Sequence, residues 1–179
     1  MCILDIAPKA FESTPDLRFC TQNGLVKRSA ATEYAVRRQR FAALALKDGD
    51  RVVDVALAQP HADVAIIARS GISIRFTLDT VPSQGRVSGG VKGIALAIGD
   101  QVIRGCTLQN SEHMLVFSES GYAKRIPCAM LDPQGRGGKG VKCFGFNKNG
   151  SNDRHCRPCQ AQRRARFYRA AGWRHAQSP

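Results

Sequence analysis

A segment of about fifty residues recurs three times along this chain, and no other feature of the sequence limits the possible folds as strongly. Dipeptides typical of tight turns stand at equivalent positions of the three copies: Asn23-Gly24, Ser70-Gly71 and Ser120-Gly121. Their glycines are 47 and 50 residues apart, and an arginine follows each glycine four residues later, at Arg28, Arg75 and Arg125. Because short apolar runs flank these turns, each copy predicts a β-hairpin whose glycine adopts positive φ.

The second half of each copy carries a group of cations, and in copies 2 and 3 it is also rich in glycine. Thirteen residues after the turn glycines of copies 2 and 3 come two related triplets, Gln84-Gly85-Arg86 and Gln134-Gly135-Arg136. The first copy carries Arg37-Arg38-Gln39-Arg40 in this place and is three residues shorter. Copies 1 and 2 then reach a Gly-Asp pair and a further apolar run, at residues 52–55 and 102–105.

Four short strands per copy, repeated at this period, predict an all-β chain of blades set around an axis. We expect blade 1 at residues 17–62, blade 2 at 63–112 and an incomplete blade 3 at 113–150 without its closing strand. Residues 1–16 are interpreted as the end of a preceding blade plus a linker, because residues 3–7 resemble the strand at 52–56.

Residues 151–179 differ in composition from the repeats. They contain seven arginines and no Val, Ile, Leu or Met, so they lack the aliphatic residues for the missing strand. We therefore expect a basic tail that is foreign to the fold, as an out-of-frame terminus would be, and that is disordered or weakly helical. The strand near 141–146 would then be a partly unpaired edge, which favours self-association.

The chain carries a net charge of +13, from 27 Lys and Arg against 14 Asp and Glu. Such an excess favours a polyanionic partner, first of all nucleic acid, over an ordinary basic surface. No stretch is apolar and long enough to span a membrane, and no secretory signal is visible, so the expected location is the cytoplasm. The seven cysteines are expected to be small buried side chains, not a disulfide framework.

The glycine-rich stretches are the predicted nucleic-acid contacts. Glycines let a backbone approach phosphates closely, and the neighbouring cations contact phosphates without reading the bases. The alternative is a set of flexible, solvated loops and strand ends. The predicted DNA-binding residues are Lys27, Arg28, Arg37, Arg38, Arg40, Arg75, Arg86, Lys92, Lys124, Arg125, Gln134, Arg136, Lys139 and Lys142.

The sequence offers no catalytic or metal-binding constellation. Gly135, Gly137 and Gly140 match a dinucleotide-binding pattern, but the residues that follow predict a strand where such a site needs a helix. A P-loop would need Ser or Thr after Lys139. His155, Cys156 and Cys159 lack a matching fourth zinc ligand, so no metal or cofactor is expected in this chain.

With the repeats aligned, residues 17–150 resemble the C-terminal domain of the bacterial DNA gyrase A subunit and of the topoisomerase IV A subunit. The resemblance rests on residues 23–28, on 84–94 and on 134–140. The last stretch is similar to the family's Gln-Arg-Arg-Gly-Gly-Lys-Gly box, with Gly135 in place of an arginine. The resemblance implies a partial β-pinwheel, a propeller-like disc whose blades exchange strands and whose basic rim wraps DNA.

The resemblance further implies sequence-independent binding and wrapping of duplex DNA within an ATP-dependent type II topoisomerase. The partners would be duplex DNA, the remainder of the A subunit and an ATPase B subunit. The family's catalytic tyrosine and breakage–reunion core have no counterpart here, so no activity of the chain alone is expected. The alternatives are a stand-alone basic β-repeat that binds nucleic acid and a truncated, non-functional fragment.

Overall fold

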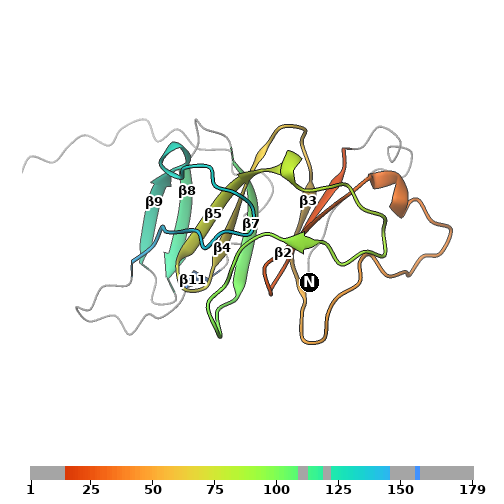
Figure 1. Cartoon of the computed structure of the whole chain (residues 1–179), viewed down its shortest axis with the longest axis horizontal. Coiled ribbons are helices and arrows are strands. Elements are labelled where there is room, and N and C mark those ends of the chain that lie inside the picture. The colour runs from red at the N-terminus through yellow and green to blue at the C-terminus, as the bar shows by residue number, and fades with distance from the viewer. Residues whose placement is uncertain (1–14, 109–112, 119–121, 146–155, 158–179) are drawn as a thin grey trace, which may run out of the picture.

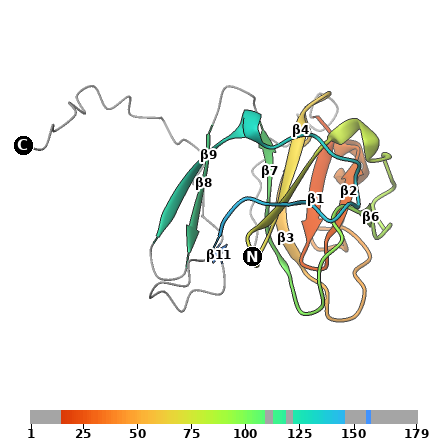
Figure 2. The same cartoon turned by 60° about the vertical axis from the view of Figure 1, so that its left-hand side comes forward.

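The computed structural model describes residues 15–108, 113–118, 122–145 and 156–157. In these ranges the chain is all-β, with short 3-10 turns and no α-helix. Three antiparallel sheets stand side by side along the molecule (Figure 2). The predicted β-pinwheel architecture is therefore confirmed in its fold class.

Sheet 1 has the strand order β3-β1-β2-β6, with β1 (Leu17–Thr21), β2 (Leu25–Ser29), β3 (Val52–Leu57) and β6 (Val91–Lys92). Sheet 2 has the order β10-β5-β4-β7, with β4 (Asp63–Ala68), β5 (Ile72–Thr77), β7 (Val102–Leu108) and β10 (Val141–Lys142). Sheet 3 has the order β11-β8-β9, with β8 (His113–Ser118), β9 (Ala123–Pro127) and β11 (Cys156–Arg157).

Each of the first two sheets takes its last strand from the following copy of the repeat. β6 of copy 2 pairs with β2 of copy 1, and β10 of copy 3 pairs with β5 of copy 2. In Figure 2 the teal chain of copy 3 crosses the middle sheet toward β6 before it turns back. The copies are consequently interlocked, and each sheet stabilises the next copy along the chain.

Two expectations about the C-terminal part are corrected. Val141–Lys142 is hydrogen-bonded to β5 in sheet 2, so this stretch is not the edge of an incomplete third blade. Cys156–Arg157 pairs with β8 in the place that β3 and β7 take beside β1 and β4, so a short closing strand exists. Strand pairing uses backbone groups and needs no aliphatic side chain, which the composition argument overlooked. The other residues of 146–179 and residues 1–14 lie outside the described ranges.

Three 3-10 turns follow the second hairpin strands: η1 (Ala31–Tyr34), η2 (Leu78–Thr80) and η3 (Cys128–Met130). Buried apolar side chains fill the space between consecutive sheets, with Ile66, Ile74 and Phe76 fully buried in the middle one. Among the described residues, Cys20, Cys106 and Cys143 carry free thiols. Burial raises the pKa of the Cys106 thiol to about 12, so it packs as an apolar group.

Candidate nucleic-acid interface

The equivalent stretches of the three copies, here called loop A (37–46), loop B (84–95) and loop C (134–145), are hydrogen-bonded in series, A to B and B to C. Loops B and C are rich in glycine, whereas loop A contains none. The Ala45 N–H of loop A donates to the Ser88 carbonyl of loop B at 3.2 Å. The Gly137 N–H of loop C donates to the Gly93 carbonyl of loop B at 2.8 Å. Loops from copies that are far apart in sequence therefore form one continuous rim.

The hairpins fix where loops B and C begin. The backbone N–H of Gln84 donates to the Arg28 carbonyl at 2.8 Å, and that of Gln134 to the Arg75 carbonyl at 2.7 Å. Both glutamine side chains are half-buried. The repeated glutamine thus marks the residue at which each loop leaves the preceding hairpin.

Eight of the predicted DNA-binding cations are exposed. They lie in loop A (Arg37, Arg38, Arg40), in loop B (Lys92), on β9 (Lys124, Arg125) and in loop C (Lys139, Lys142). Loops A, B and C hold six of these eight side chains, so most of the exposed predicted charge follows the continuous rim. These residues are available to a polyanion.

The arginines of the two Gln-Gly-Arg triplets, Arg86 in loop B and Arg136 in loop C, hold the preceding loop in place. Arg86 donates from Nη1 to the Ala42 carbonyl of loop A. Arg136 donates from Nη1 to the Lys92 carbonyl at 2.7 Å and from Nε to the Thr80 carbonyl at 3.3 Å. Because both guanidinium groups are partly exposed, they position the rim and still present charge to solvent.

Lys27 does not lie on the surface. The residue is 1% exposed, its Nζ donates to the Ala43 and Arg86 carbonyls, and it sits 5.8 Å from the ring centre of Phe19. The ammonium group therefore joins loop A to loop B from beneath. The prediction that Lys27 contacts DNA does not fit this burial.

Arg75 is also buried and joins two copies. Its Nε lies 2.7 Å from the Asp63 carboxylate. Its Nη1 donates to the Cys128 and Leu131 carbonyls, at 2.9 and 3.1 Å, around η3 of the next copy. The repeated Gly-x-x-x-Arg arginine is thus a link between copies here, and the prediction that Arg75 contacts DNA does not fit this geometry.

Arg28 occupies the same position in copy 1, with its side chain 27% exposed. Its Nε lies 2.9 Å from the Asp16 carboxylate, and its Nη1 lies 3.7 Å from the Asp79 carboxylate on η2. The aspartate partners are not among the residues predicted from sequence, although Asp16 and Asp63 each stand eight residues before a turn glycine. That spacing was the signal for a structural ion pair.

We expect the stability of the chain to rise between about pH 8 and pH 10.5 because of Lys27. Burial, with a smaller effect from the Arg86 charge, lowers the pKa of the Lys27 ammonium from 10.5 to about 8. In this window the unfolded chain holds a proton that the folded chain has lost, so the free energy of unfolding increases with pH, by at most about 3 kcal/mol. Urea titrations at several pH values give the free energy of unfolding, and its dependence on pH across this window should differ between the wild type and Lys27→Met. Parallel pH profiles would contradict the assignment.

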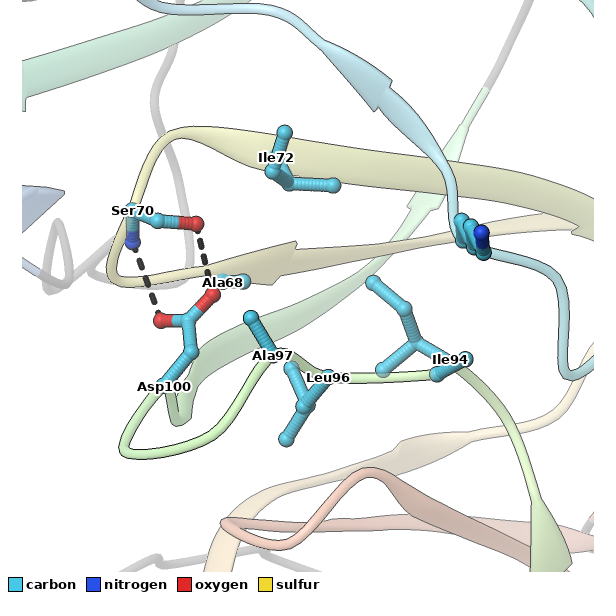
Figure 3. A pocket seen from close by; sticks show the side chains of 9 residues that line it. Ala68, Ser70, Ile72, Ile94, Leu96, Ala97 and Asp100 are labelled. Atoms are coloured by element: carbon cyan, nitrogen blue, oxygen red, sulfur yellow. Dashed lines mark hydrogen bonds between the residues drawn. The ribbon is translucent and has the colours of Figure 1, made fainter.

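A pocket of about 340 Å³ opens beside the β4–β5 hairpin (Figure 3). Its walls are mostly apolar and include Ile72, Ile94 and Leu96, and Lys139 of loop C also lines it. The Asp100 carboxylate accepts hydrogen bonds from the Ser70 N–H at 3.1 Å and from its hydroxyl at 2.6 Å. This carboxylate therefore ties the hairpin turn to the Gly-Asp turn.

The part of the chain that the structure describes contains no group of three or more His, Cys, Asp or Glu side chains that could hold a metal ion. No described helix is long and apolar enough to cross a membrane.

The repeated four-stranded sheets with exchanged strands and a basic rim define a β-propeller-type repeat domain. A family model described as "DNA gyrase C-terminal domain, beta-propeller" matches residues 17–59, 62–104 and 112–152, which is well over half of the chain. The chain belongs to this family.

Similar proteins agree with this assignment. The chain is 35% identical over 89 residues to the DNA gyrase A subunit of Lawsonia intracellularis and 34% identical over 89 residues to that of Mycolicibacterium smegmatis. These matches cover 49% and 48% of this chain and 11% of each relative, so the chain matches about a tenth of the relatives' length.

Among solved structures, the C-terminal domain of DNA topoisomerase IV superposes with a TM-score of 0.77 at 26% identity, covering 83% of this chain and 46% of that one. A DNA gyrase A C-terminal domain superposes with a TM-score of 0.70 at 23% identity, covering 78% of this chain and 46% of that one. The chain thus corresponds to a little under half of either solved domain.

Proposed function

We propose that this chain binds duplex DNA through the phosphate backbone, without sequence preference, along the rim formed by loops A, B and C. The observation that carries the proposal is the hydrogen-bonded series of loops A, B and C with exposed cations on each of them. Glycines permit close approach of a phosphate, and cations at successive positions follow a charged backbone. Family membership supports this activity.

The wider role that we propose is DNA wrapping within a gyrase-like type II topoisomerase. The similar proteins are named as A subunits of DNA gyrase, so the remainder of an A subunit and an ATPase B subunit are the proposed partners. In this proposal the cations of the rim contact phosphates, and such contacts position the duplex without reading its bases. The chemistry of strand breakage would belong to those partners.

The salt dependence of binding tests this proposal. We expect log affinity for a random-sequence duplex to fall linearly with log salt, by about 0.9 for each phosphate contacted. Lys139→Ala combined with Lys142→Ala should lower the slope by about two units and weaken binding to all sequences alike. Fluorescence anisotropy with AT-rich and GC-rich duplexes measures both quantities.

The matched control is Arg51→Ala, because Arg51 is exposed just before β3 and outside the three loops. It should leave the salt slope unchanged. A wild-type slope near zero, or a marked preference for one duplex, would exclude backbone binding. An unchanged salt slope in the variant with Lys139→Ala and Lys142→Ala would mean that DNA binds elsewhere on the chain.

A further inference from the structure

The described residues form two junctions between consecutive copies, and in both an arginine of one copy contacts the 3-10 turn of the next or the residues beside it. At the first, Arg28 of β2 reaches Asp79 on η2. At the second, Arg75 of β5 donates to carbonyls that flank η3. In each case the arginine of one copy therefore holds the 3-10 turn of the next.

The exchanged strand is the second component of each junction. The Gly24 carbonyl accepts the N–H groups of Gly93 and Ile94, at 2.8 and 3.2 Å. The Gly71 carbonyl accepts the N–H groups of the equivalent Cys143 and Phe144, at 2.9 and 3.1 Å. A junction thus requires an arginine and an open strand edge on one side, and a 3-10 turn and a loop with free N–H groups on the other.

Copy 3 presents the first half of such a junction. β9 lies at the end of its sheet, and no described strand pairs with its outer edge. Arg125, the equivalent of Arg28 and Arg75, is exposed on β9, where its backbone faces Leu115 of β8. Its side chain makes no ion pair or hydrogen bond with the described residues. Tyr122 and Met130, exposed by 63% and 74%, add apolar area. We call this surface the sheet-3 face.

Copy 1 presents the second half. η1 carries the exposed Glu33, whose carboxylate accepts the backbone N–H of Arg86 at 3.2 Å through one oxygen. The N–H groups of Ala43 and Leu44, which are equivalent to Gly93 and Ile94, donate no hydrogen bond to any described residue. Phe41 and Leu46 of loop A are 38% and 43% exposed. We call this surface the sheet-1 face. Figure 1 shows β9 at one end of the long axis and the orange turn η1 toward the other.

We propose that the sheet-3 face of one chain binds the sheet-1 face of a second copy of this chain, as a third junction of the same design. Arg125 would meet η1 and Glu33 of the second copy, and the edge of β9 would pair with its loop A. Because the two faces differ and lie at opposite ends, the contact is head-to-tail. A head-to-tail assembly leaves no face uncovered only when its copies form a closed ring. Two copies would contain nearly the extent of one solved domain, since one copy covers 46% of it, so a ring of two is the expected product.

Sedimentation velocity of the full chain at about 0.3 M salt tests the proposal, because salt screens the cations that both faces carry. The wild type should sediment as a dimer. Arg125→Glu and Glu33→Lys should each weaken dimerisation about tenfold or more, since each opposes like charges across the junction. Arg51→Glu, which changes the net charge as much as Arg125→Glu does, should leave the dimer intact. Thermal unfolding checks that every variant is folded.

Mixing the two weakened variants is the decisive measurement. Each keeps one intact face, so an equimolar mixture of Arg125→Glu and Glu33→Lys chains should recover dimers. A dimer that Arg125→Glu weakens but Glu33→Lys does not would indicate pairing of β9 with β9 and would overturn the proposal. A monomeric wild type at micromolar concentration would overturn it as well.

Discussion

Asp54→Ala is expected to lower the free energy of unfolding by about 3–5 kcal/mol, because it leaves a buried arginine without its counter-ion. Arg18 on β1 is 1% exposed, and its Nη2 lies 2.7 Å from the Asp54 carboxylate on β3. Arg104 on β7 approaches the same carboxylate at 3.4 Å. Asp54 therefore balances charge where sheet 1 meets sheet 2. Urea unfolding followed by circular dichroism measures the loss.

Two controls separate burial from charge in this experiment. Arg18→Met combined with Asp54→Leu removes both partners, and it should recover most of the stability because no charge is left buried. Asp16→Ala breaks the more exposed pair with Arg28, whose side chains are 27% and 30% exposed, and should cost less than about 1 kcal/mol. Equal losses of unfolding free energy for Asp54→Ala and Asp16→Ala would show that burial of the ion pair does not determine the cost of breaking it.

The hairpins and the period of the repeat could be predicted from sequence because they depend on local chemistry. Asn23-Gly24 and Ser70-Gly71 lie between β1 and β2 and between β4 and β5, and Gly24 and Gly71 adopt φ of +85° and +80°. The strands expected at 52–55 and 102–105 begin β3 and β7. The predicted turn at Ser120-Gly121 lies outside the described residues.

Burial of cations could not be predicted in this way. Lys27 and Arg28 are neighbours in the sequence, yet only Lys27 is covered, because loop B of the next copy folds over it. The exchange of strands places acceptors from a distant segment around Lys27 and Arg75. Local sequence patterns therefore predict that every cation of the repeat lies on the surface, although Lys27 and Arg75 are buried and join the copies.

Gly71→Ala is expected to lower the free energy of unfolding by about 3 kcal/mol or more, while Gly49→Ala should cost only about 1–2 kcal/mol. Both glycines have positive φ, +80° and +74°, so both substitutions strain the backbone similarly. A Cβ on Gly71 would lie 2.5 Å from the Phe144 carbonyl oxygen, whereas one on Gly49 would meet nothing within 4 Å. The difference in unfolding free energy therefore isolates the cost of displacing the exchanged segment of copy 3.

The same pair of variants connects the strand exchange to DNA binding. The Gly71 carbonyl accepts hydrogen bonds from Cys143 and Phe144, so its substitution should speed amide hydrogen exchange at these two residues and displace loop C. DNA affinity should then fall in Gly71→Ala under conditions where the variant is still folded, and stay unchanged in Gly49→Ala. Equal unfolding costs for the two variants would mean that the exchanged segment adapts to the added methyl group. Unchanged DNA affinity in Gly71→Ala would mean that the rim does not depend on the anchoring of loop C.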